Sequence, residues 1–441
     1  MNFSRFQILL GHAWRPGGCG GFPLGRHSSR WLAWTALLLL PLLGKAAGGG
    51  TAVPPAAQAA AGEKTAFSAE ETRGVWMWSS DVRQEGAEAA AERLSRYHIN
   101  KVYFLVKGLS GRVCYPSKLV PAGRSDRDEL KEILEACHKR HIEVHAWFIF
   151  HSDGVWARSH PEDVMCLAGK RGAWDQGPQP AKDAQTAHIC PLSEDYRAHF
   201  KGLIQEVLDR YPVDGIHLDC IRYTDMLYCF CPRHQALAAT NGIDVAKVRE
   251  AIYKTLYSPK KNSEYYFDLY RAGDRDVTGW VHMREGEIDR MVKEVRALVK
   301  TKSPSLVLSA AFMPEGGELD DAYALCHYAQ NYATAGSLLD YILPMSYHKT
   351  YGKSPAWVAQ IAQNAGQKSH RPVYSGIQAY GKDSPGMERE AKDNAGRAMP
   401  KNLSPQELRE TILAVEKQGI KGFVLFRYGS LTDQMWEDLP L

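Results

Sequence analysis

The sequence lacks several common signatures of protein function. Its 441 residues contain no Gly-x-Gly-x-x-Gly fingerprint and no P-loop, the motifs that hold phosphates in many nucleotide-binding folds. No His-x-His or His-Glu-x-x-His spacing indicates a catalytic metal. No apolar run reaches the ~20 residues that a helix needs to span a bilayer. We therefore expect neither a cofactor nor a metal ion.

A basic surface is also missing beyond the N-terminal segment. The whole chain has 54 Lys and Arg against 50 Asp and Glu, but without residues 1–48 the balance is 49 against 50. Nucleic-acid binding depends on clustered positive charge, so we expect no nucleic-acid partner. The basic residues that precede the first acidic residue, Glu63, are Arg5, Arg15, Arg26, Arg30 and Lys45.

Residues 1–48 read as a signal peptide or an N-terminal anchor. A basic stretch precedes the apolar run at 31–44, which has the length of a signal-peptide core. Small residues follow, with plausible cleavage sites between Ala47 and Ala61, although Pro41 interrupts the run and leaves an uncleaved anchor as the alternative. We expect export to the periplasm, the envelope or the exterior, with membrane contact only through this segment.

Cysteine is present at nine positions, of which Cys19 lies in the leader. The other eight could pair in an oxidising compartment, but the sequence does not give their pairing. Cys229, Cys231 and His234 resemble half of a zinc site, with no fourth ligand nearby in the sequence. A disulfide or plain loop packing is the favoured interpretation of this cluster.

Strand-like and helix-like stretches alternate after a linker. Residues 49–70, rich in Ala, Gly and Pro, are expected to form a flexible linker. Beyond it, eight runs rich in β-branched and aromatic residues alternate with amphipathic stretches, as in a (β/α)₈ TIM barrel spanning 71–441. The expected strands lie at 73–80, 101–108, 143–150, 215–223, 306–314, 341–348, 372–381 and 422–430. The expected helices lie at 87–98, 127–141, 195–211, 286–302, 354–366 and 404–419.

The two largest insertions are predicted after the fourth strand (224–276) and the seventh (382–402). Both would lie on the C-terminal rim, where barrel enzymes build their sites.

The fourth predicted strand ends in a carboxylate. Side chains alternate along a strand, so Asp219 and His217 should point into the barrel while Leu218 and Cys220 face the helices. A charge at this place needs a partner or solvent, and Arg222 is near enough in sequence to pair with it. Asp219 is thus either a salt-bridged rim residue or a catalytic group.

An ordered set of motifs gives this site a context. The stretches "RGVWMWSS", "VYFLVKGLSGRVCYPS", "LKEILEACHKRHIEVHAWF", "HPEDV", "ICPLSEDYRAHF" and "VDGIHLDCIRY" resemble the family-10-like bacterial glycosyl hydrolases. The resemblance is strongest through Tyr223 and implies an envelope barrel that cleaves glycans, including peptidoglycan strands. The chitinase signature also registers here, but Ile221 stands where its acid Glu belongs.

Glycoside cleavage generally needs two carboxyl groups. We predict that Asp219 is the nucleophile and that Glu315, just after the fifth strand, is the acid/base, with the reverse assignment open. The reserve candidates are Asp81, Asp153 and Asp225.

Aromatic and polar residues near the strand ends are suited to sugars. Each one, taken alone, also fits barrel packing, and His145 and His217 also fit the core. The predicted substrate contacts are Trp76, Trp78, Lys107, His145, Trp147, His217, Arg222, Tyr223, Tyr347, His348, Gln378, Tyr380 and Arg427.

Three functions remain open at this point. The first is an exported glycoside hydrolase acting on a polysaccharide. The second is a glycan-binding barrel without a working carboxylate pair, and the third is a metal-dependent polysaccharide hydrolase or deacetylase.

Overall fold

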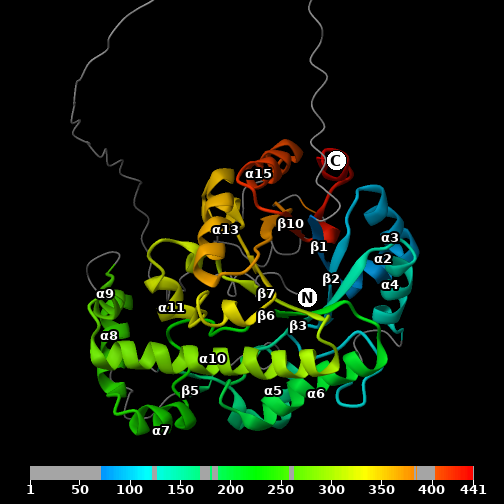
Figure 1. Ribbon diagram of the computed structural model, residues 1–441. Coiled ribbons are helices and arrows are strands. Elements are labelled where there is room, and N and C mark those ends of the chain that lie inside the picture. Colours follow the sequence, from blue (N-terminus) through cyan, green and yellow to red (C-terminus); the bar gives the residue numbers. More distant parts are fainter. Residues whose placement is uncertain are drawn as a thin grey trace, which may run out of the picture. The chain divides into compact units, whose positions relative to one another are not determined.

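The protein forms an eight-stranded parallel barrel, seen in the computed structural model (Figure 1). The structure describes residues 71–121, 127–168, 179–180, 187–257, 263–381, 384 and 403–440. The sheet order is β8-β7-β6-β3-β2-β1-β10-β9, and isolated parallel bridges between β8 and β9 close it. The strands are β1 (Thr72–Trp78), β2 (Lys101–Lys107), β3 (Glu143–Ile149), β6 (Gly215–Asp219), β7 (Val307–Phe312), β8 (Tyr341–Pro344), β9 (Ser375–Gln378) and β10 (Gly422–Phe426).

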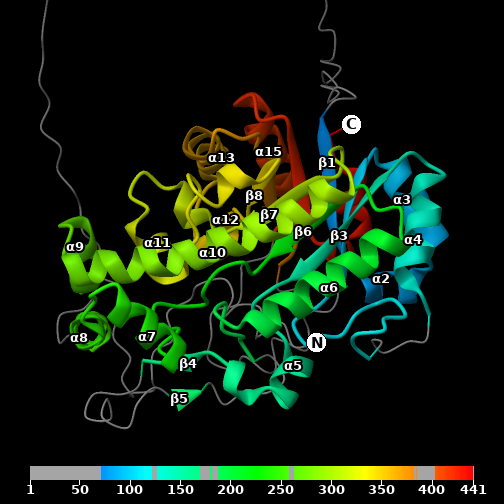
Figure 2. The same cartoon turned by 60° about the horizontal axis from the view of Figure 1, so that its bottom comes forward.

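Helices surround the barrel and connect its strands (Figures 1 and 2). Their starts are set by side-chain caps, for example Ser193 before α6 and Ser404 before α15, which accept backbone N–H groups of the first turn. The connecting helices are α2 (Ser79–Glu85), α3 (Ala87–Arg96), α4 (Glu129–His138), α6 (Glu194–Arg210), α10 (Arg275–Lys302), α11 (Ala322–Tyr328), α12 (His348–Tyr351), α13 (Pro355–Ser369) and α15 (Pro405–Lys417), and α16 (Asp433–Glu437) follows the last strand.

Two excursions enlarge the barrel. Between β3 and α6 the chain forms α5 (Gly154–Ser159), η2 (Pro161–Asp163), β4 (Cys166–Leu167) and β5 (Gln179–Pro180). After β6 it forms α7 (Pro232–Thr240), α8 (Val245–Leu256) and α9 (Tyr265–Arg271), and the last two pack against the first half of α10 (Figure 1). Short 3₁₀ helices occupy η4 (Pro314–Gly317), η5 (Gly336–Leu338) and η6 (Tyr428–Ser430).

Three apolar clusters stabilise this arrangement. The first fills the space between strands and helices, the second fills the inside of the barrel, and the third lies within the insertion after β6. At the β8–β9 junction Gly376 permits close approach, because a Cβ there would lie 2.6 Å from the carbonyl oxygen of Pro344.

The predicted (β/α)₈ barrel is confirmed, and each of the eight predicted strand runs contains an observed strand. The insertion after the fourth strand is present, and the one at 382–402 lies almost wholly outside the described residues. The excursion between β3 and α6 was not predicted as an insertion. Residues 1–70, with the predicted leader and linker, also lie outside the described part. Within that part, no helix has both the length and the apolar character required to cross a membrane.

Candidate active site

Asp219 is the last residue of β6 and is only 2% exposed. Cys220 follows it in the left-handed conformation, with φ +53°, and donates its N–H to Asp219 Oδ1 at 2.6 Å. The Arg222 guanidinium lies 3.5 Å from the same oxygen. The carboxylate is therefore held at the C-terminal end of the barrel with a positive charge beside it.

The prediction that Cys220 faces the helices is wrong. Its side chain belongs to the apolar cluster inside the barrel, whereas Leu218 lies in the cluster under the helices. Side chains alternate between the two faces of a strand only while the backbone is extended. The left-handed conformation of Cys220 ends the extended segment, and the alternation ends with it.

Glu315 lies in η4, immediately after the neighbouring strand β7, and is partly buried. The Tyr328 hydroxyl donates to its Oε1 at 3.5 Å and the Tyr351 hydroxyl to its Oε2 at 3.4 Å. Burial raises the pKa of Glu315 to about 7, while these hydroxyl groups and the charge of Arg222 act in the opposite direction. Glu315 is thus a carboxyl group that holds a proton close to neutral pH.

Arg222 connects the two carboxyl groups. It is paired with Asp219, and its charge also acts on Glu315, Tyr328 and Tyr351. The charge of Arg222 lowers the pKa of Glu315, against the larger effect of burial, which raises it. Asp219 and Glu315 therefore lie at the C-terminal ends of the neighbouring strands β6 and β7, and the charge of Arg222 acts on Glu315 as well as pairing with Asp219.

Tyr347 and Trp147 carry buried polar groups inside the barrel. Burial, followed by Tyr380 and Asp219, raises the pKa of Tyr347, and its ring packs 5.4 Å from Phe426. Within the described residues, the Tyr347 hydroxyl and Trp147 Nε1 have no hydrogen-bond partner. Buried polar groups usually have partners, so both are suited to bind hydroxyl groups of a ligand.

Other predicted contacts lie deeper in the barrel. Trp76 Nε1 donates to His217 Nε2 at 3.1 Å, and His217 Nδ1 lies 3.0 Å from Ser309 Oγ. Both rings are buried and have partners inside the barrel. His145 is the third residue of β3, bonded to Glu143 at the strand start, so it lies toward the N-terminal end, opposite the carboxyl pair. Trp76, His145 and His217 therefore contribute to barrel packing.

Lys107, predicted as a substrate contact, lies outside the barrel wall, where its Nζ is near the rings of Tyr196 and Phe200 on α6. The β2–β3 register shifts between Leu105 and Lys107, and such a bulge reverses the alternation. Lys107 Nζ lies 3.1 Å from Asp153 Oδ2 and donates to the carbonyl oxygens of Ile149 and Ser152. Its ammonium group therefore has partners within the protein, and Asp153 is its counter-ion.

The remaining reserve carboxylates are also paired. Asp81 accepts from Arg427 at 2.8 Å, and that guanidinium stacks 3.8 Å above the Trp78 ring. Asp225 Oδ2 lies 3.6 Å from His327 Nδ1. These pairs fix loops on the rim of the barrel.

The last group of predicted contacts surrounds α12. Gln378 Oε1 accepts from the backbone and side chain of Thr350, and Tyr380 bonds to the Thr350 hydroxyl at 3.0 Å. His348 is buried, and burial lowers its pKa to about 4. Gln378 and Tyr380 therefore hold the segment that places Tyr347 and Tyr351 at the site.

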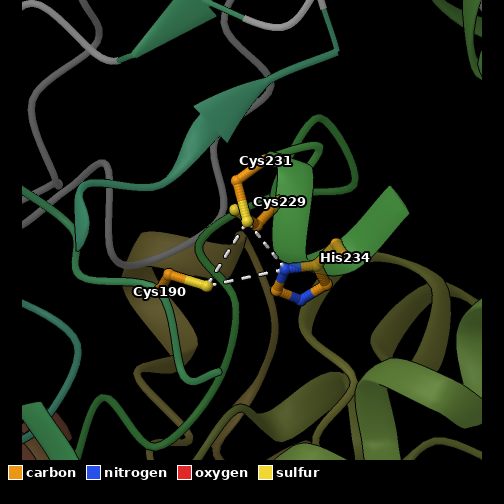
Figure 3. Close-up of side chains that lie close together, drawn as sticks. All are labelled: Cys190, Cys229, Cys231 and His234. Carbon is orange, nitrogen blue, oxygen red and sulfur yellow. Dashed lines mark hydrogen bonds between the residues drawn. The ribbon is translucent and has the colours of Figure 1, made fainter. Parts of the chain in front are cut away.

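Tyr223 lies beside a different cluster. Its hydroxyl and His234 Nε2 are 2.7 Å apart, and His234 lies with Cys190, Cys229 and Cys231 in one buried group (Figure 3). All eight cysteines of the described residues are free and buried. Of the two interpretations favoured for Cys229, Cys231 and His234, a disulfide or loop packing, the disulfide is therefore not formed in this structure.

Three residues at the site were not found from the sequence. Tyr328 and Tyr351 lie 13 and 36 residues from Glu315, with no local motif to connect them. His151 is the second residue after β3, and this position just beyond a strand end is a signal that could have identified it. Burial lowers the pKa of His151 to about 3, and its Nε2 has no hydrogen-bond partner within the described residues.

The fold and the site define a glycoside hydrolase-like (β/α)₈ barrel. The chain belongs to the Glycosyl hydrolase-like 10 family, whose model matches residues 71–392. This membership implies a carbohydrate substrate.

Known relatives are distant. The chain is 27% identical over 164 residues to glycosyl hydrolase DigH of Escherichia coli K12, an alignment that covers 33% of this chain and 36% of DigH. It is similar in fold to the glycoside hydrolase domain of PgaB (BpsB) from Bordetella bronchiseptica, with a TM-score of 0.60, 13% identity, and 81% and 94% of the two chains covered. For alpha-L-fucosidase isoenzyme 2 of Paenibacillus thiaminolyticus the TM-score is 0.56, with 15% identity and 84% and 46% covered.

Proposed function

We propose that this protein is an exported glycoside hydrolase that cleaves glycan strands of the cell envelope, with peptidoglycan as the first candidate substrate. The observation that carries the proposal is the meeting of Asp219 and Glu315 around Arg222 at the C-terminal end of the barrel. Export is inferred from the apolar run at 31–44.

The two carboxyl groups have different environments and thus different roles. Glu315, with a pKa of about 7, is the acid that protonates the leaving glycosidic oxygen. Asp219, paired with Arg222, is the carboxylate that attacks the anomeric carbon or activates water. Glu315 then accepts a proton from the incoming water if the intermediate is covalent. Tyr347 and Trp147 supply hydrogen-bonding groups for sugar hydroxyls.

Family membership supports carbohydrate chemistry. The choice of an envelope glycan rests on what the resemblance of the sequence motifs implies. The alternative of a metal-dependent hydrolase has less support. Among the described residues the group suited to a metal consists of Cys190, Cys229, Cys231 and His234, all buried. Four protein ligands fill a tetrahedral coordination sphere and leave no position for the water or substrate that a catalytic metal binds.

Release of reducing ends tests the proposal. The full chain is incubated with glycan strands freed of stem peptides and with a panel of other polysaccharides. New reducing ends from one glycan would support the proposal and name its substrate. Binding to a glycan without release would instead favour the non-catalytic glycan-binding barrel.

The pH dependence of kcat/KM should follow the titration of Glu315. A general acid must be protonated, and the protonated fraction of Glu315 falls as the pH rises through about 7. We expect kcat/KM to fall above about pH 7 on the basic limb. Tyr351→Phe removes a donor that favours the carboxylate, so the basic limb should move to higher pH.

The control for this profile is Tyr253→Phe on α8, which removes a tyrosine hydroxyl within the insertion. It should leave the profile unchanged. A basic limb that does not respond to Tyr351→Phe would contradict the assignment of Glu315 as the acid.

A further inference from the structure

Four side chains from two distant segments form one buried group. Cys229 and Cys231 precede α7, His234 lies in its first turn, and Cys190 comes from the segment before α6. The Sγ atoms and His234 Nδ1 lie within 4.8 Å of one another, and Figure 3 shows Cys190, Cys231 and His234 facing one another.

The separations match those between ligands of one tetrahedral metal ion. Cys190 Sγ lies 3.6 Å from Cys231 Sγ and 3.5 Å from His234 Nδ1, and Cys231 Sγ lies 3.2 Å from that nitrogen. With zinc–sulfur bonds of about 2.3 Å and zinc–nitrogen bonds of about 2.0 Å, tetrahedral geometry separates two sulfurs by about 3.8 Å and sulfur from nitrogen by about 3.5 Å. A disulfide requires a sulfur–sulfur distance of about 2.05 Å.

The histidine is oriented as a metal ligand. Its Nε2 lies 2.7 Å from the Tyr223 hydroxyl, which can accept a proton from Nε2 when zinc takes the lone pair of Nδ1, the nitrogen on the side of the sulfurs. Histidines that bind metals usually make such a bond with the other ring nitrogen. The backbone N–H of Cys166 likewise donates to Cys229 Sγ at 3.3 Å, a contact that stabilises a thiolate.

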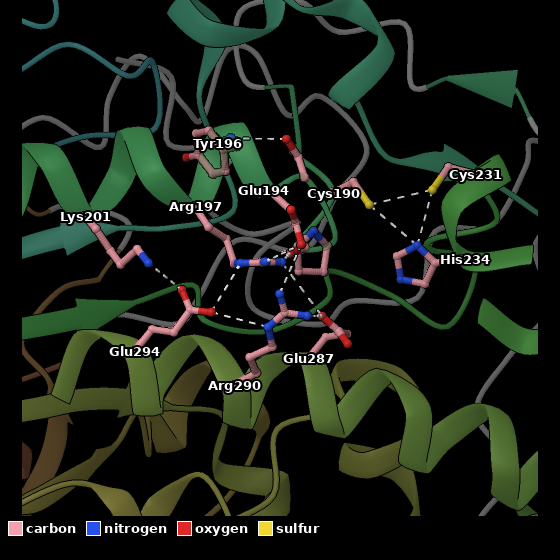
Figure 4. Close-up of polar contacts among 12 residues, drawn as sticks. Cys190, Glu194, Tyr196, Arg197, Lys201, Cys231, His234, Glu287, Arg290 and Glu294 are labelled. Atoms are coloured by element: carbon pink, nitrogen blue, oxygen red, sulfur yellow. Dashed lines mark hydrogen bonds and ion pairs between the residues drawn. The ribbon is translucent and has the colours of Figure 1, made fainter. Parts of the chain in front are cut away.

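Contacts around the group hold the two segments in place without a metal. Arg233 pairs with Asp163 at 2.8 Å, and the Cys190 N–H donates to the Asp163 carbonyl oxygen. Arg197 donates to the Pro191 carbonyl oxygen at 2.9 Å. Next to Cys190, Arg197 and its neighbours on α6 form an ion-pair network with α10 (Figure 4).

We propose that Cys190, Cys229, Cys231 and His234 bind a structural zinc ion through three thiolates and His234 Nδ1. Four protein ligands close the coordination sphere, which is the arrangement of structural rather than catalytic zinc. Binding releases the thiol protons to solvent, with no change in oxidation state. The ion would fasten the loop after β6 to the excursion after β3, whatever the substrate of the enzyme.

The zinc also has a consequence for the carboxyl pair. Tyr223, which contacts His234, is the residue after Arg222, and the guanidinium of Arg222 lies beside Asp219. The segment from Asp219 to His234 is thus fixed at both ends, by β6 and by the metal ligands. This fixation holds Arg222 beside Asp219, where its charge also acts on Glu315.

Metal analysis of the protein tests the proposal. The full chain is expressed without a polyhistidine tag in zinc-supplied medium, and its metals are quantified by inductively coupled plasma mass spectrometry. We expect about one zinc per chain, and a thiolate-to-cobalt charge-transfer band after exchange with Co²⁺. Cys231→Ala should lower the zinc content at least about tenfold and reduce the melting temperature.

Two variants serve as controls. Cys137→Ala removes a buried thiol from α4, and Cys166→Ala removes a thiol next to the group but outside the ligand set. Both should retain the metal. The proposal would be overturned by wild-type protein without zinc, by iron in its place, or by a disulfide that joins Cys190 to Cys229 or Cys231 in non-reducing mass spectrometry. Because the wild-type measurement needs no variant, misfolding of Cys231→Ala cannot obscure the answer.

Discussion

Asp219→Asn and Glu315→Gln are each expected to reduce kcat/KM on the glycan substrate by about 10²–10⁴-fold. In the proposed mechanism Asp219→Asn removes the charge that faces the anomeric carbon, while the amide still fits beside the Cys220 N–H and Arg222. In the same mechanism Glu315→Gln removes the proton that the leaving oxygen receives. The double variant should be about as inactive as the less active of the two single variants, because the effects of substituting residues that act in one step are not additive.

The leaving group separates the two roles. An aryl glycoside with an acidic phenol needs no general acid, so Glu315→Gln should retain most activity on it whereas Asp219→Asn should not. Steady-state rates on the natural glycan and on this substrate check the assignment. The reverse pattern would exchange the roles of the two residues. Glu437→Gln, an exposed carboxyl on α16, should match the wild type on both substrates.

Stability provides an independent control for Glu315→Gln. The folded protein keeps the proton on Glu315 up to about pH 7, whereas the unfolded chain loses it near 4.5. The wild type therefore loses stability as the pH rises from about 4.5 to about 7, by on the order of 1–3 kcal/mol, and the variant does not. Denaturation at pH 8 should show a more stable but inactive variant, with little difference at pH 4.

Asp153→Asn is expected to destabilise the protein by about 3–5 kcal/mol, because it leaves the buried Lys107 ammonium without its counter-ion. Asn can still cap α5, where Asp153 Oδ1 accepts from the Trp156 N–H at 2.8 Å. Burial already lowers the pKa of Lys107, and Asp153 opposes this effect. The loss of stability relative to the wild type should become smaller as the pH rises, because Lys107 in the variant then loses its unpaired charge.

Chemical denaturation across pH checks this expectation. Lys107→Met combined with Asp153→Asn should be more stable than Asp153→Asn alone. Asp433→Asn breaks the pair with Arg93 at a residue whose side chain is 90% exposed, so it should cost no more than about 1 kcal/mol. If Asp153→Asn and Asp433→Asn reduced the free energy of unfolding equally, the charge of Lys107 would have to be compensated in another way.

The barrel could be predicted because its strands are long apolar runs with β-branched and aromatic residues, separated by capped amphipathic helices. The sequence also placed Asp219 correctly at a strand end, since its alternation with His217 needs only local geometry. The proximity of Glu315 followed from the rule that neighbouring parallel strands end at the same side of a barrel.

The depth of a side chain along the barrel axis and irregularities in strand register could not be predicted in the same way. Alternation indicates which face of a strand a residue occupies but not its height along the barrel axis. For His145 the sequence therefore left a substrate contact and a core position open, and the structure places it toward the N-terminal end. The bulge after Leu105 has no signal in the sequence, and it turned Lys107 outward. Cys190 lies 41 residues before Cys231 and joins it only through the fold.

The closure of the barrel is uneven. Seven of its strand pairs form continuous ladders, whereas β8 and β9 meet through the bridges Ile342–Val373 and Met345–Gly376. Backbone amides on this seam should exchange with deuterium sooner than those of β2 and β3, because fewer bonds must break to expose them. Tyr347 and Gln378 lie at the end of the same seam. Local breathing there would widen the mouth on the β8–β9 side while the ladders that join β6 to β3 and β7 stay closed, so a long polymer could enter beside this seam without displacing Asp219.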